Sequence, residues 1–457
     1  MDNPPRVVIV GAGPAGLAAA RHLVEGGIRP VVLEESARAG GQGTRRLVAH
    51  MSHHRNRIYG RAASGMAARE TVEDAVLSQC DFRTGTLVWG SHAGRLELLG
   101  PDGYDSLPYT HLLIAVGATD RVLPLPGWTL PGVFTLGGAQ VALKRHASFI
   151  GDRIVFAGSS PLMYLAAAQY LRLGHPDLTI LDTTPLSRKI RSFPAMMRHA
   201  PKTALQGISL MAELRRAGIK MAFGVALKAI EGGERVNTIE YATRGGQIVR
   251  TPVGAVALGY GLRPELQLAE LAGATLRYDK RHRQWFAQVD AMGQATDGLW
   301  IAGDGSRIGG AEAADAAGFL AAESMLTTLG HPAADPLKIR HSRRRLKRQQ
   351  CFQDAMTGAF QWPAASAPNI PDETLVCRCE RICAGEIRHA ITTSLGPVEI
   401  NRVKAVTRCG MGRCQGRFCG PALGELVAIA TGEAPGYLRA QAPIRPVPLL
   451  ATDSEHT

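Results

Sequence analysis

The stretch "RVVIVGAGPAGLAAARHLVEGGIRPVVLEES", residues 6–36, decides the fold. Its β-branched start, residues 6–10, predicts a buried parallel strand. The strand leads into the spacing G-x-G-x-x-G at Gly11, Gly13 and Gly16. The first glycine permits a tight turn, the second lets a pyrophosphate approach the backbone, and the third lets helix and strand pack closely. We therefore expect a dinucleotide-binding β–α–β unit here.

The residues after this turn support the same interpretation. Pro14 and Ala15 would begin the helix, where the missing N–H of a proline costs little. The free N–H groups and the positive dipole end of that helix would face the diphosphate. A second strand at 31–33 ends at Glu34, where a carboxylate would bond the ribose hydroxyls of the adenosine.

Three later glycine segments favour FAD over a free nicotinamide cofactor. In "AGGQGTRR" (39–46), the glycine pair lets the backbone pass a bulky ring system, and Gln42 can bond a ribityl or isoalloxazine group. "HLLIAVGATDR" (111–121) is another apolar strand that ends at a glycine. In "GLWIAGDGSRIGGAEAADAAGFLAA" (298–322), Asp304 can bond a ribityl hydroxyl, and the following helix points its dipole at the flavin pyrimidine. The residues expected to hold FAD lie at glycine turns, strand ends and helix starts: Gly11, Gly13, Pro14, Ala15, Gly16, Glu34, Glu35, Gly41, Gln42, Val88, Gly117, Gly303, Asp304, Gly310 and Ala311.

These segments resemble the two-dinucleotide-domain flavoproteins, the family of thioredoxin and glutathione reductases, from residue 5 to about residue 330. The resemblance implies an α/β fold with Rossmann-like domains. The FAD-binding domain would comprise 1–122 and 259–335, and an NAD-like domain would be inserted at 123–258. Disulfide reductases of this family need a cysteine pair beside the flavin, and no pair precedes residue 377. We therefore expect a different electron acceptor.

The second strand–turn–helix unit, residues 151–182, carries a degenerate glycine motif. Gly158 is kept, but Ser160 stands at the second glycine position and Met163 at the third. A side chain at 160 would sit where the backbone must meet a diphosphate, and Met163 would loosen the contact between helix and strand. Asp182 could still bond a ribose. The sequence argues against NAD(P) and leaves open a vestigial domain or another nucleotide.

Six of the eight cysteines lie in "CRCERIC" (377–383) and "CGMGRCQGRFCG" (409–420). The N-terminus lacks the features of a secretory signal, and no apolar stretch is long enough to span a bilayer. We therefore expect a cytoplasmic protein, with peripheral association with the inner membrane left open. Thiols stay reduced there, so clustered cysteines indicate metal or redox chemistry rather than disulfides.

The cysteine spacing resembles the ferredoxin domain named after the bacterioferritin-associated ferredoxin, a small α-rich module. This implies a 2Fe–2S domain at 372–457 whose ligands are a C-x-C pair and a C-x4-C pair: Cys377, Cys379, Cys414 and Cys419. Cys409 and Cys414 are also spaced as C-x4-C, so Cys409 could replace Cys419. Zinc would satisfy the same thiolates but has no role beside a flavin.

Other residues of this segment have plainer expected roles. Cys383 precedes a helical pattern and would act as a helix-start substitute for Ser or Thr. Arg413 and Arg417 would offset the negative charge of the cluster. Cys80 and Cys351 stand alone and would be small buried hydrophobes.

The net charge of +13 owes much to "KIRHSRRRLKR" (338–348), in a predicted region of basic helix and linker at 336–371. No nucleic-acid-binding module accompanies it, so a solvated or subunit-docking face is favoured. The segment 356–373, rich in Pro, Ala and Ser, predicts a linker.

The whole chain resembles the FAD-containing α subunits of heteromeric bacterial amino-acid dehydrogenases. "LPLPGWTLPGVFTLGGAQ" (123–140), "ALGYGLRPELQLAELAG" (257–273) and "APIRPVPL" (442–449) carry this resemblance. Opine oxidases, D-hydroxyproline and L-proline dehydrogenases and the hydrogen cyanide synthase flavoprotein subunit belong to that family. It implies a D-amino-acid-oxidase-like β flavoprotein that oxidises an amino or imino acid, and it leaves open an FMN at a subunit interface and a small third subunit.

The expected function is electron transfer through FAD and a 2Fe–2S cluster, with no catalytic residue assigned in this chain. Two alternatives remain open at this point. One is a stand-alone NAD(P)H-dependent reductase, and the other is a non-catalytic scaffold subunit.

Overall fold

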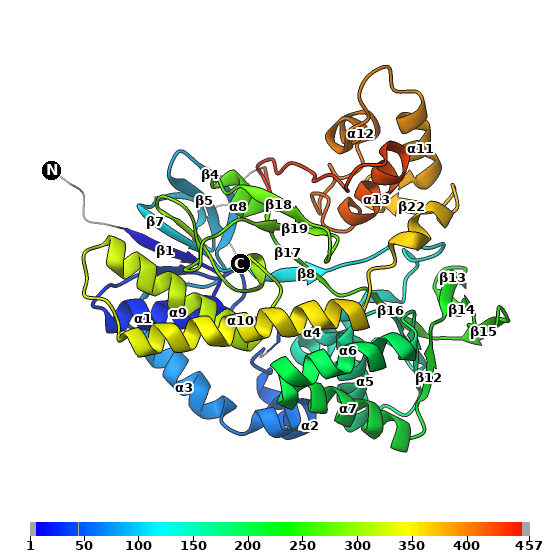
Figure 1. The fold of residues 1–457 in the computed structure, drawn as a ribbon, viewed down its shortest axis with the longest axis horizontal. Coiled ribbons are helices and arrows are strands. Elements are labelled where there is room, and N and C mark those ends of the chain that lie inside the picture. Colours follow the sequence, from blue (N-terminus) through cyan, green and yellow to red (C-terminus); the bar gives the residue numbers. More distant parts are fainter. Residues whose placement is uncertain (1–5, 44, 450–457) are drawn as a thin grey trace, which may run out of the picture.

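A computed structural model describes residues 6–43 and 45–449 (Figure 1). Its first sheet has the strand order β20-β21-β7-β1-β2-β3. β1 (Val7–Val10) pairs in parallel with β2 (Val31–Leu33) and β7 (His111–Ile114), and all four residues of β1 are buried. The strand expected at 6–10 is thus confirmed, beginning one residue later.

The helix after the glycine turn packs against a helix from much later in the chain. α1 (Pro14–Glu25) begins with its proline, and α9 (Ala311–Thr328) lies beside it (Figure 1). A Cβ added to Gly318 would lie 2.0 Å from the backbone oxygen of Ala15, so the two helices touch through backbone atoms. This contact brings the segment around Asp304 to the glycine turn.

The other elements around this sheet cover it or extend it. The part of the chain that contains the first sheet also has a three-stranded antiparallel sheet, β4-β5-β6, and the two-stranded pairs β8–β17 and β18–β19. The bounds are η1 Ala49–His54, α2 Arg55–Tyr59, η2 Gly60–Ala63, α3 Met66–Leu77, β3 Asp81–Arg83, β4 Leu87–His92, β5 Arg95–Gly100, β6 Gly103–Pro108, β8 Ala118–Asp120, β17 Leu262–Pro264, α8 Gln267–Leu271, β18 Leu276–Asp279, β19 Gln284–Ala287, β20 Gln294–Thr296, β21 Leu299–Ile301 and η3 Gly303–Gly305.

The middle of the chain forms a second, parallel sheet with the order β12-β11-β10-β16-β9. Met163 is fully buried in the core cluster that also holds Phe156 and Ile180, so this core accommodates a side chain at the third motif position. The flexible thioether fills the space that a glycine would leave. The bounds are β9 Val133–Thr135, α4 Leu136–His146, β10 Ile154–Gly158, α5 Pro161–Arg172, β11 Leu178–Asp182, α6 Leu186–His199, α7 Pro201–Arg216, β12 Lys220–Phe223, β13 Ala226–Gly232, β14 Val236–Ala242, β15 Ile248–Pro252 and β16 Ala255–Gly259.

The C-terminal cysteines lie in a small module of three helices and a two-stranded pair, at the upper right of Figure 1. Its elements are β22 Leu375–Cys377, β23 Ile382–Cys383, α11 Ala384–Thr392, α12 Ile400–Thr407 and α13 Gly420–Thr431. Cys383 is the N-cap of α11, and its backbone N–H donates to Glu386 at 2.8 Å, which confirms the expected helix-start role.

A long basic helix, α10 (Pro336–Ala359), runs across the molecule between the two dinucleotide-binding parts (Figure 1). It includes the first residues of the segment expected as a linker, and the turn η4 (Ala364–Asn369) follows with Ala367 fully buried. Residues 356–359 of the expected linker are therefore helical, and Ala367 and Ile370 in its remaining part are buried. Cys351, on α10, is only half-buried, whereas Cys80 is buried as expected.

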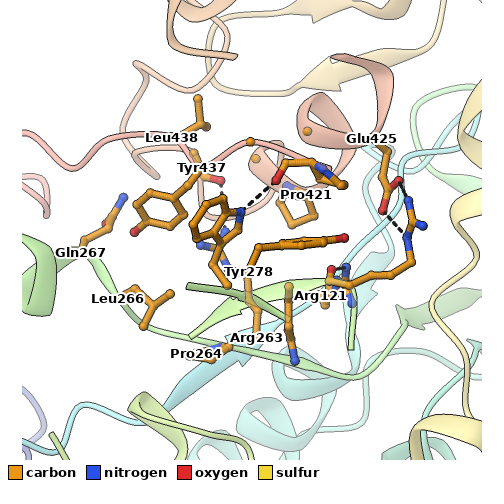
Figure 2. Close-up of a pocket in the computed structure, with 18 of the residues that line it drawn as sticks. Arg121, Arg263, Pro264, Leu266, Gln267, Tyr278, Pro421, Glu425, Tyr437 and Leu438 are labelled. Atoms are coloured by element: carbon orange, nitrogen blue, oxygen red, sulfur yellow. Dashed lines mark hydrogen bonds and ion pairs between the residues drawn. The ribbon is translucent and has the colours of Figure 1, made fainter. Parts of the chain in front are cut away.

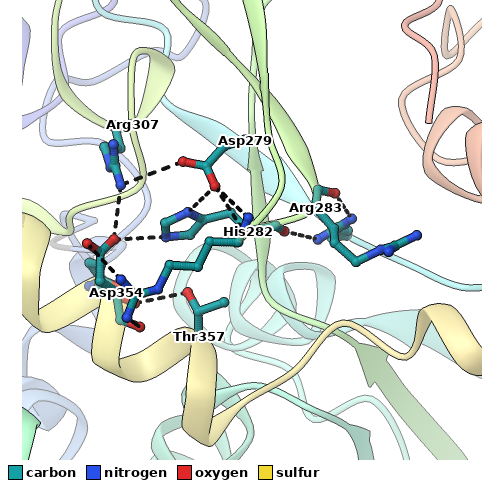
Figure 3. Close-up of polar contacts among 9 residues, drawn as sticks. Asp279, His282, Arg283, Arg307, Asp354 and Thr357 are labelled. Carbon is teal, nitrogen blue, oxygen red and sulfur yellow. Dashed lines mark hydrogen bonds and ion pairs between the residues drawn. The ribbon is translucent and has the colours of Figure 1, made fainter. Parts of the chain in front are cut away.

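Side-chain contacts hold α10 against the rest of the chain. His282 lies between Asp279 and Asp354, with nitrogen-to-oxygen distances of 3.1 and 3.3 Å (Figure 3). Arg307, from the loop before α9, donates to Asp354 at 2.9 Å. Arg345 of α10 also pairs with Asp315 of α9, so one basic residue of this helix is directed toward its own chain. Among the described residues, no helix is long and apolar enough to cross a membrane.

Candidate functional site

The first glycine turn has the backbone that a dinucleotide requires. Gly11 has φ +100°, and a Cβ there would lie 2.6 Å from the backbone oxygen of Ala115. A Cβ on Gly16 would lie 1.9 Å from the oxygen of Gly11. By contrast, a Cβ on Gly13 would meet only the Cα of Gly41, at 3.8 Å. Gly11 and Gly16 are therefore needed for the fold itself, whereas Gly13 keeps open a cradle beside the N-terminus of α1.

Glu34 lies at the end of β2, next to this turn. Its two carboxylate oxygens accept hydrogen bonds from the backbone N–H groups of Ala12 and Ser36, at 2.8 and 2.9 Å. These bonds fix the carboxylate beside the cradle. Glu35 instead is exposed and pairs with Arg445.

The other strand ends meet at the same edge of the sheet. A Cβ on Gly303 would lie 2.9 Å from the Cβ of Ala15, and a Cβ on Gly305 would lie 3.5 Å from the backbone nitrogen of Gly117. One oxygen of Asp304 accepts hydrogen bonds from the N–H groups of Gly309 and Gly310, at 2.7 and 2.9 Å. Burial raises the pKa of Asp304, although these two bonds act in the opposite direction.

The expected FAD contacts are thus mostly brought together, including Pro14 at the start of α1 and Ala311 at the start of α9. Gln42 follows Gly41, whose added Cβ would lie 3.2 Å from the Cα of Gly13. Val88 is buried on β4 in the hydrophobic core, and Gln42 is exposed and accepts a hydrogen bond from Arg45. Thr44, in the same quoted segment, is outside the described residues. The open cradle, the helix N-terminus and the fixed carboxylate fit a dinucleotide.

Sequence reasoning missed Lys144, which is fully buried on α4. Its ammonium lies 3.5 Å from the backbone oxygen of Gly43 and 5.3 Å from the ring centre of Tyr59. Burial, together with the charge of Arg45, lowers its pKa to about 8. The only signal in the sequence is a lysine on an otherwise apolar helix face, and that pattern does not reveal the distant loop it touches.

The acid of the second dinucleotide-binding unit is already used within the chain. Asp182 is fully buried, and its Oδ2 accepts a hydrogen bond from the hydroxyl of Tyr164 at 2.6 Å and pairs with Lys189 at 2.8 Å. Its Oδ1 accepts from the N–H of Thr184 at 2.8 Å. Ser160 caps α5, and its hydroxyl accepts from the N–H of Leu162 at 3.2 Å. The groups that would receive a nucleotide therefore have internal partners.

Five cysteines gather in one centre of the C-terminal module. The sulfur atoms of Cys377, Cys409 and Cys419 all lie within 4.8 Å of one another, and all three residues are buried. Cys414 contacts Cys419, and Cys379 contacts Cys414. The structure therefore places Cys409 in the same centre as Cys419, and it places all four cysteines expected as ligands in this centre. Hydrogen bonds from Cys409 and Cys419 lower the pKa of Cys377 to about 2.

The chemistry of this donor set fits an iron–sulfur cluster. Thiolate sulfurs are the ligands of 2Fe–2S clusters, and four are needed. A Cβ on Gly412 would lie 2.4 Å from the Cβ of Cys379, so this glycine lets the 409–419 segment approach the C-x-C pair. Cys383 is outside the centre, at the start of α11.

Arg417 lies between two of these cysteines in sequence but does not have the role expected for it. Its guanidinium pairs with Glu265 at 2.6 Å, and both side chains are 6% exposed. It also donates to the backbone oxygens of Cys414 and Ile444, at 3.2 and 2.7 Å. The backbone N–H of Glu265 donates to the oxygen of Gly117 at 3.0 Å. Arg417 thus fastens the cysteine segment to the sheet edge where FAD is expected, because its charge is paired with Glu265.

A small pocket, with a cavity volume of about 60 Å³, lies between the cysteine module and the β17–β19 segment (Figure 2). Gln267 and Tyr437 line one side, and Tyr278 and Arg121 lie toward the other. Among the described residues, buried side-chain atoms without a hydrogen-bond partner include Gln267 Oε1, Tyr278 OH, Gln284 Oε1 and Tyr437 OH, which all belong to residues lining this pocket. Buried polar atoms are rarely left unpaired, so these atoms indicate a site for a polar molecule.

A matched pair of glycine variants tests the cradle. Because Gly13 has open space, Gly13→Ala should fold normally and lose FAD at least about tenfold, since the methyl group stands where the diphosphate must lie. Gly16→Ala should instead destabilise the fold by about 3 kcal/mol or more, because the methyl group meets backbone. The flavin-to-protein absorbance ratio and the thermal midpoint separate the two effects. Full flavin content in Gly13→Ala would show that the cofactor lies elsewhere.

Comparisons with known proteins agree with this geometry. The family described as pyridine nucleotide-disulphide oxidoreductase matches residues 5–318, and the BFD-like [2Fe-2S] binding domain matches residues 375–429. The first match implies FAD binding and the second a 2Fe–2S cluster.

Similar proteins extend over nearly the whole chain. An opine oxidase subunit of Agrobacterium tumefaciens (strain Ach5) is 35% identical, covering 97% of this chain and 90% of that protein. Hydrogen cyanide synthase subunit HcnB of Pseudomonas aeruginosa is 31% identical, covering 98% of both. The crystal structure of L-proline dehydrogenase from P. horikoshii has a TM-score of 0.67 at 18% identity, covering 97% of this chain and 78% of that chain, and thus shares the fold. The chain belongs to the pyridine nucleotide-disulphide oxidoreductase family of flavoproteins, together with this opine oxidase subunit, and it carries a BFD-like [2Fe-2S] binding domain.

Proposed function

We propose that this chain is the electron-transfer subunit of a multi-subunit enzyme that oxidises an amino or imino acid of the opine, D-hydroxyproline or proline type. The oxidation of the C–N bond would take place mainly on a separate D-amino-acid-oxidase-like β flavoprotein. The names of two relatives, L-proline dehydrogenase and an opine oxidase subunit, support the substrate class and the presence of other subunits. A cytoplasmic location belongs to the same proposal.

The observation that carries the proposal is the linkage between the two cofactor sites. Arg417, within the cysteine segment, pairs with Glu265, and Glu265 in turn bonds the backbone of Gly117 at the proposed flavin edge. A bound FAD accepts two electrons at once and a 2Fe–2S cluster carries them singly, so neighbouring sites can pass electrons onward. A scaffold subunit would not need five cysteines gathered beside this edge.

We assign the binding of the two cofactors to the following residues of the chain. The N–H groups at the start of α1 would bind the FAD diphosphate, and Glu34 would hold the adenosine ribose. Asp304, fixed by two backbone N–H groups, would bond the ribityl chain. Four thiolates from Cys377, Cys379, Cys414 and Cys419 would bind the irons.

The internal pairing of Asp182 favours this proposal over an NAD(P)H-dependent reductase. A nicotinamide dinucleotide would have to displace Lys189 and Tyr164 from a fully buried carboxylate. Removing the partners of a buried charge costs several kcal/mol. Electrons would therefore reach this chain from another subunit.

Anaerobic reduction of the enzyme co-purified with its β partner tests the function. Opines, hydroxyproline or proline should bleach the flavin absorbance at least about 100-fold faster than NADH does, because the carboxylate that would bond the ribose of NADH is already paired with Lys189. A screen with an artificial dye acceptor then identifies the substrate. Prompt bleaching by NADH alone would contradict the proposal and support the reductase.

We also propose that the residues lining the pocket in Figure 2 form this chain's side of an FMN site, which another subunit would complete at the interface. Four unpaired polar atoms, from Gln267, Tyr278, Gln284 and Tyr437, could bond the polar edge of an isoalloxazine ring. Arg263, which also lines the pocket, could meet a phosphate. The aromatic rings of Tyr278 and Tyr437 would offer stacking surfaces.

Flavins released by acid from the co-purified complex and separated by chromatography test this pocket. The wild-type complex should release both FAD and FMN. Tyr437→Phe combined with Gln267→Leu should lower FMN at least about tenfold relative to FAD, because two bonding groups are lost. Tyr241→Phe, on β14 and away from the pocket lining, is the control and should leave the ratio unchanged. Release of FAD alone from the wild type, or an unchanged ratio in the double variant, would refute the FMN site.

A further inference from the structure

The cysteine centre holds one sulfur more than a 2Fe–2S cluster needs. Cys377, Cys409 and Cys419 form its buried core, with exposed fractions of 1%, 0% and 1%. Cys414 and Cys379 continue from Cys419 toward the surface, and both are half-buried. Since the C-x-C and QGRF-flanking cysteines already number four, Cys409 is left as a fifth thiol in contact with the centre.

Cys409 is surrounded by polar groups as well as by the apolar core. It lies two residues after the end of α12, and its backbone N–H donates to the hydroxyl of Thr407 at 3.2 Å. Its thiol forms hydrogen bonds with the thiols of Cys377 and Cys419. Its nearest polar neighbours are thus two of the expected ligands, and any cluster bound by these cysteines would lie beside its sulfur.

The backbone around Cys409 and Cys414 is built from turns. Positive φ angles occur at Arg408 (63°), Gly410 (95°), Gln415 (50°) and Gly416 (75°). Residues 408–419 contain no helix or strand. The cysteines of this segment are therefore positioned by turns, whereas Cys377 is the last residue of β22.

We propose that Cys409 is a reserve ligand of the cluster, which replaces Cys379 or Cys414 when either outer thiol is lost. The outer thiols are the accessible ones, so they are the first to meet oxidants or alkylating reagents. A buried thiol already in contact with the centre can then complete the set of four without a rearrangement of the fold. The inference concerns the BFD-like domain and does not depend on which substrate the enzyme oxidises.

Alanine variants of the full-length protein, purified anaerobically, test the proposal. We expect Cys409→Ala to keep the iron and sulfide content of the wild type. Cys379→Ala and Cys414→Ala should each keep at least about half of the iron, with a shifted electron paramagnetic resonance spectrum after reduction by dithionite. The double variants Cys409→Ala/Cys414→Ala and Cys409→Ala/Cys379→Ala should lose iron at least about tenfold, as expected when no fourth thiolate remains.

Cys383→Ala is the matched control, because this cysteine belongs to the same module but lies outside the centre. It should keep the iron content of the wild type, alone and combined with Cys414→Ala. FAD content and the thermal midpoint report folding. If an alanine variant loses FAD, the corresponding Cys→Ser variant, closer in volume, takes its place.

Two kinds of result would overturn the reserve-ligand proposal. Loss of iron in Cys409→Ala alone would make Cys409 an ordinary ligand. Loss of iron in both Cys379→Ala and Cys414→Ala, with Cys409 present and FAD retained, would show that the fifth thiol cannot replace an outer ligand. Retention of iron in both double variants would equally contradict it, since Cys409 would then supply nothing.

Discussion

The buried ion pair between Arg417 and Glu265 joins the two halves of the proposed electron path. Arg417 lies inside the cysteine segment, and Glu265 is bonded through its backbone to Gly117 at the edge of the first sheet. Breaking a buried pair by removing one partner costs about 3–5 kcal/mol, because the other charge is left without a counter-ion. Since neither charge is stable alone in this position, the cysteine module is held in one orientation relative to the sheet edge.

The middle domain keeps the architecture of a dinucleotide site but uses its polar groups internally. The carboxylate of Asp182 binds Lys189 and Tyr164, and Lys189 also donates to the backbone of Ala359 at the end of α10. The side chains that would receive a nucleotide ribose thus connect the middle domain to α10 through Lys189. A chain that receives its electrons from another protein does not need these side chains to bind a nicotinamide.

Much of the fold could be predicted from sequence because short motifs encode backbone requirements. The spacing of Gly11, Gly13 and Gly16 and the strand before it specify a local β–α–β unit, and the structure contains that unit. The cysteine spacing likewise indicates the module. The spacing also left Cys409 open as a ligand, and the structure places it in the centre. The burial of Lys144 and the partner of Arg417 depend on segments that meet only in three dimensions, and no local pattern encodes them. The full burial of Met163 could not be predicted from the motif either, because it depends on how its flexible side chain packs in the core of the middle domain.

Photoreduction of the bound flavin, followed by electron paramagnetic resonance of frozen samples, tests most directly whether this chain connects flavin and cluster. The full-length protein would be illuminated anaerobically with a sacrificial donor such as EDTA, and samples would be frozen at successive degrees of flavin bleaching. The account predicts that the signal of the reduced cluster grows in step with the loss of flavin absorbance. A fully bleached flavin beside an iron-loaded cluster that dithionite can reduce, yet without that signal, would contradict it.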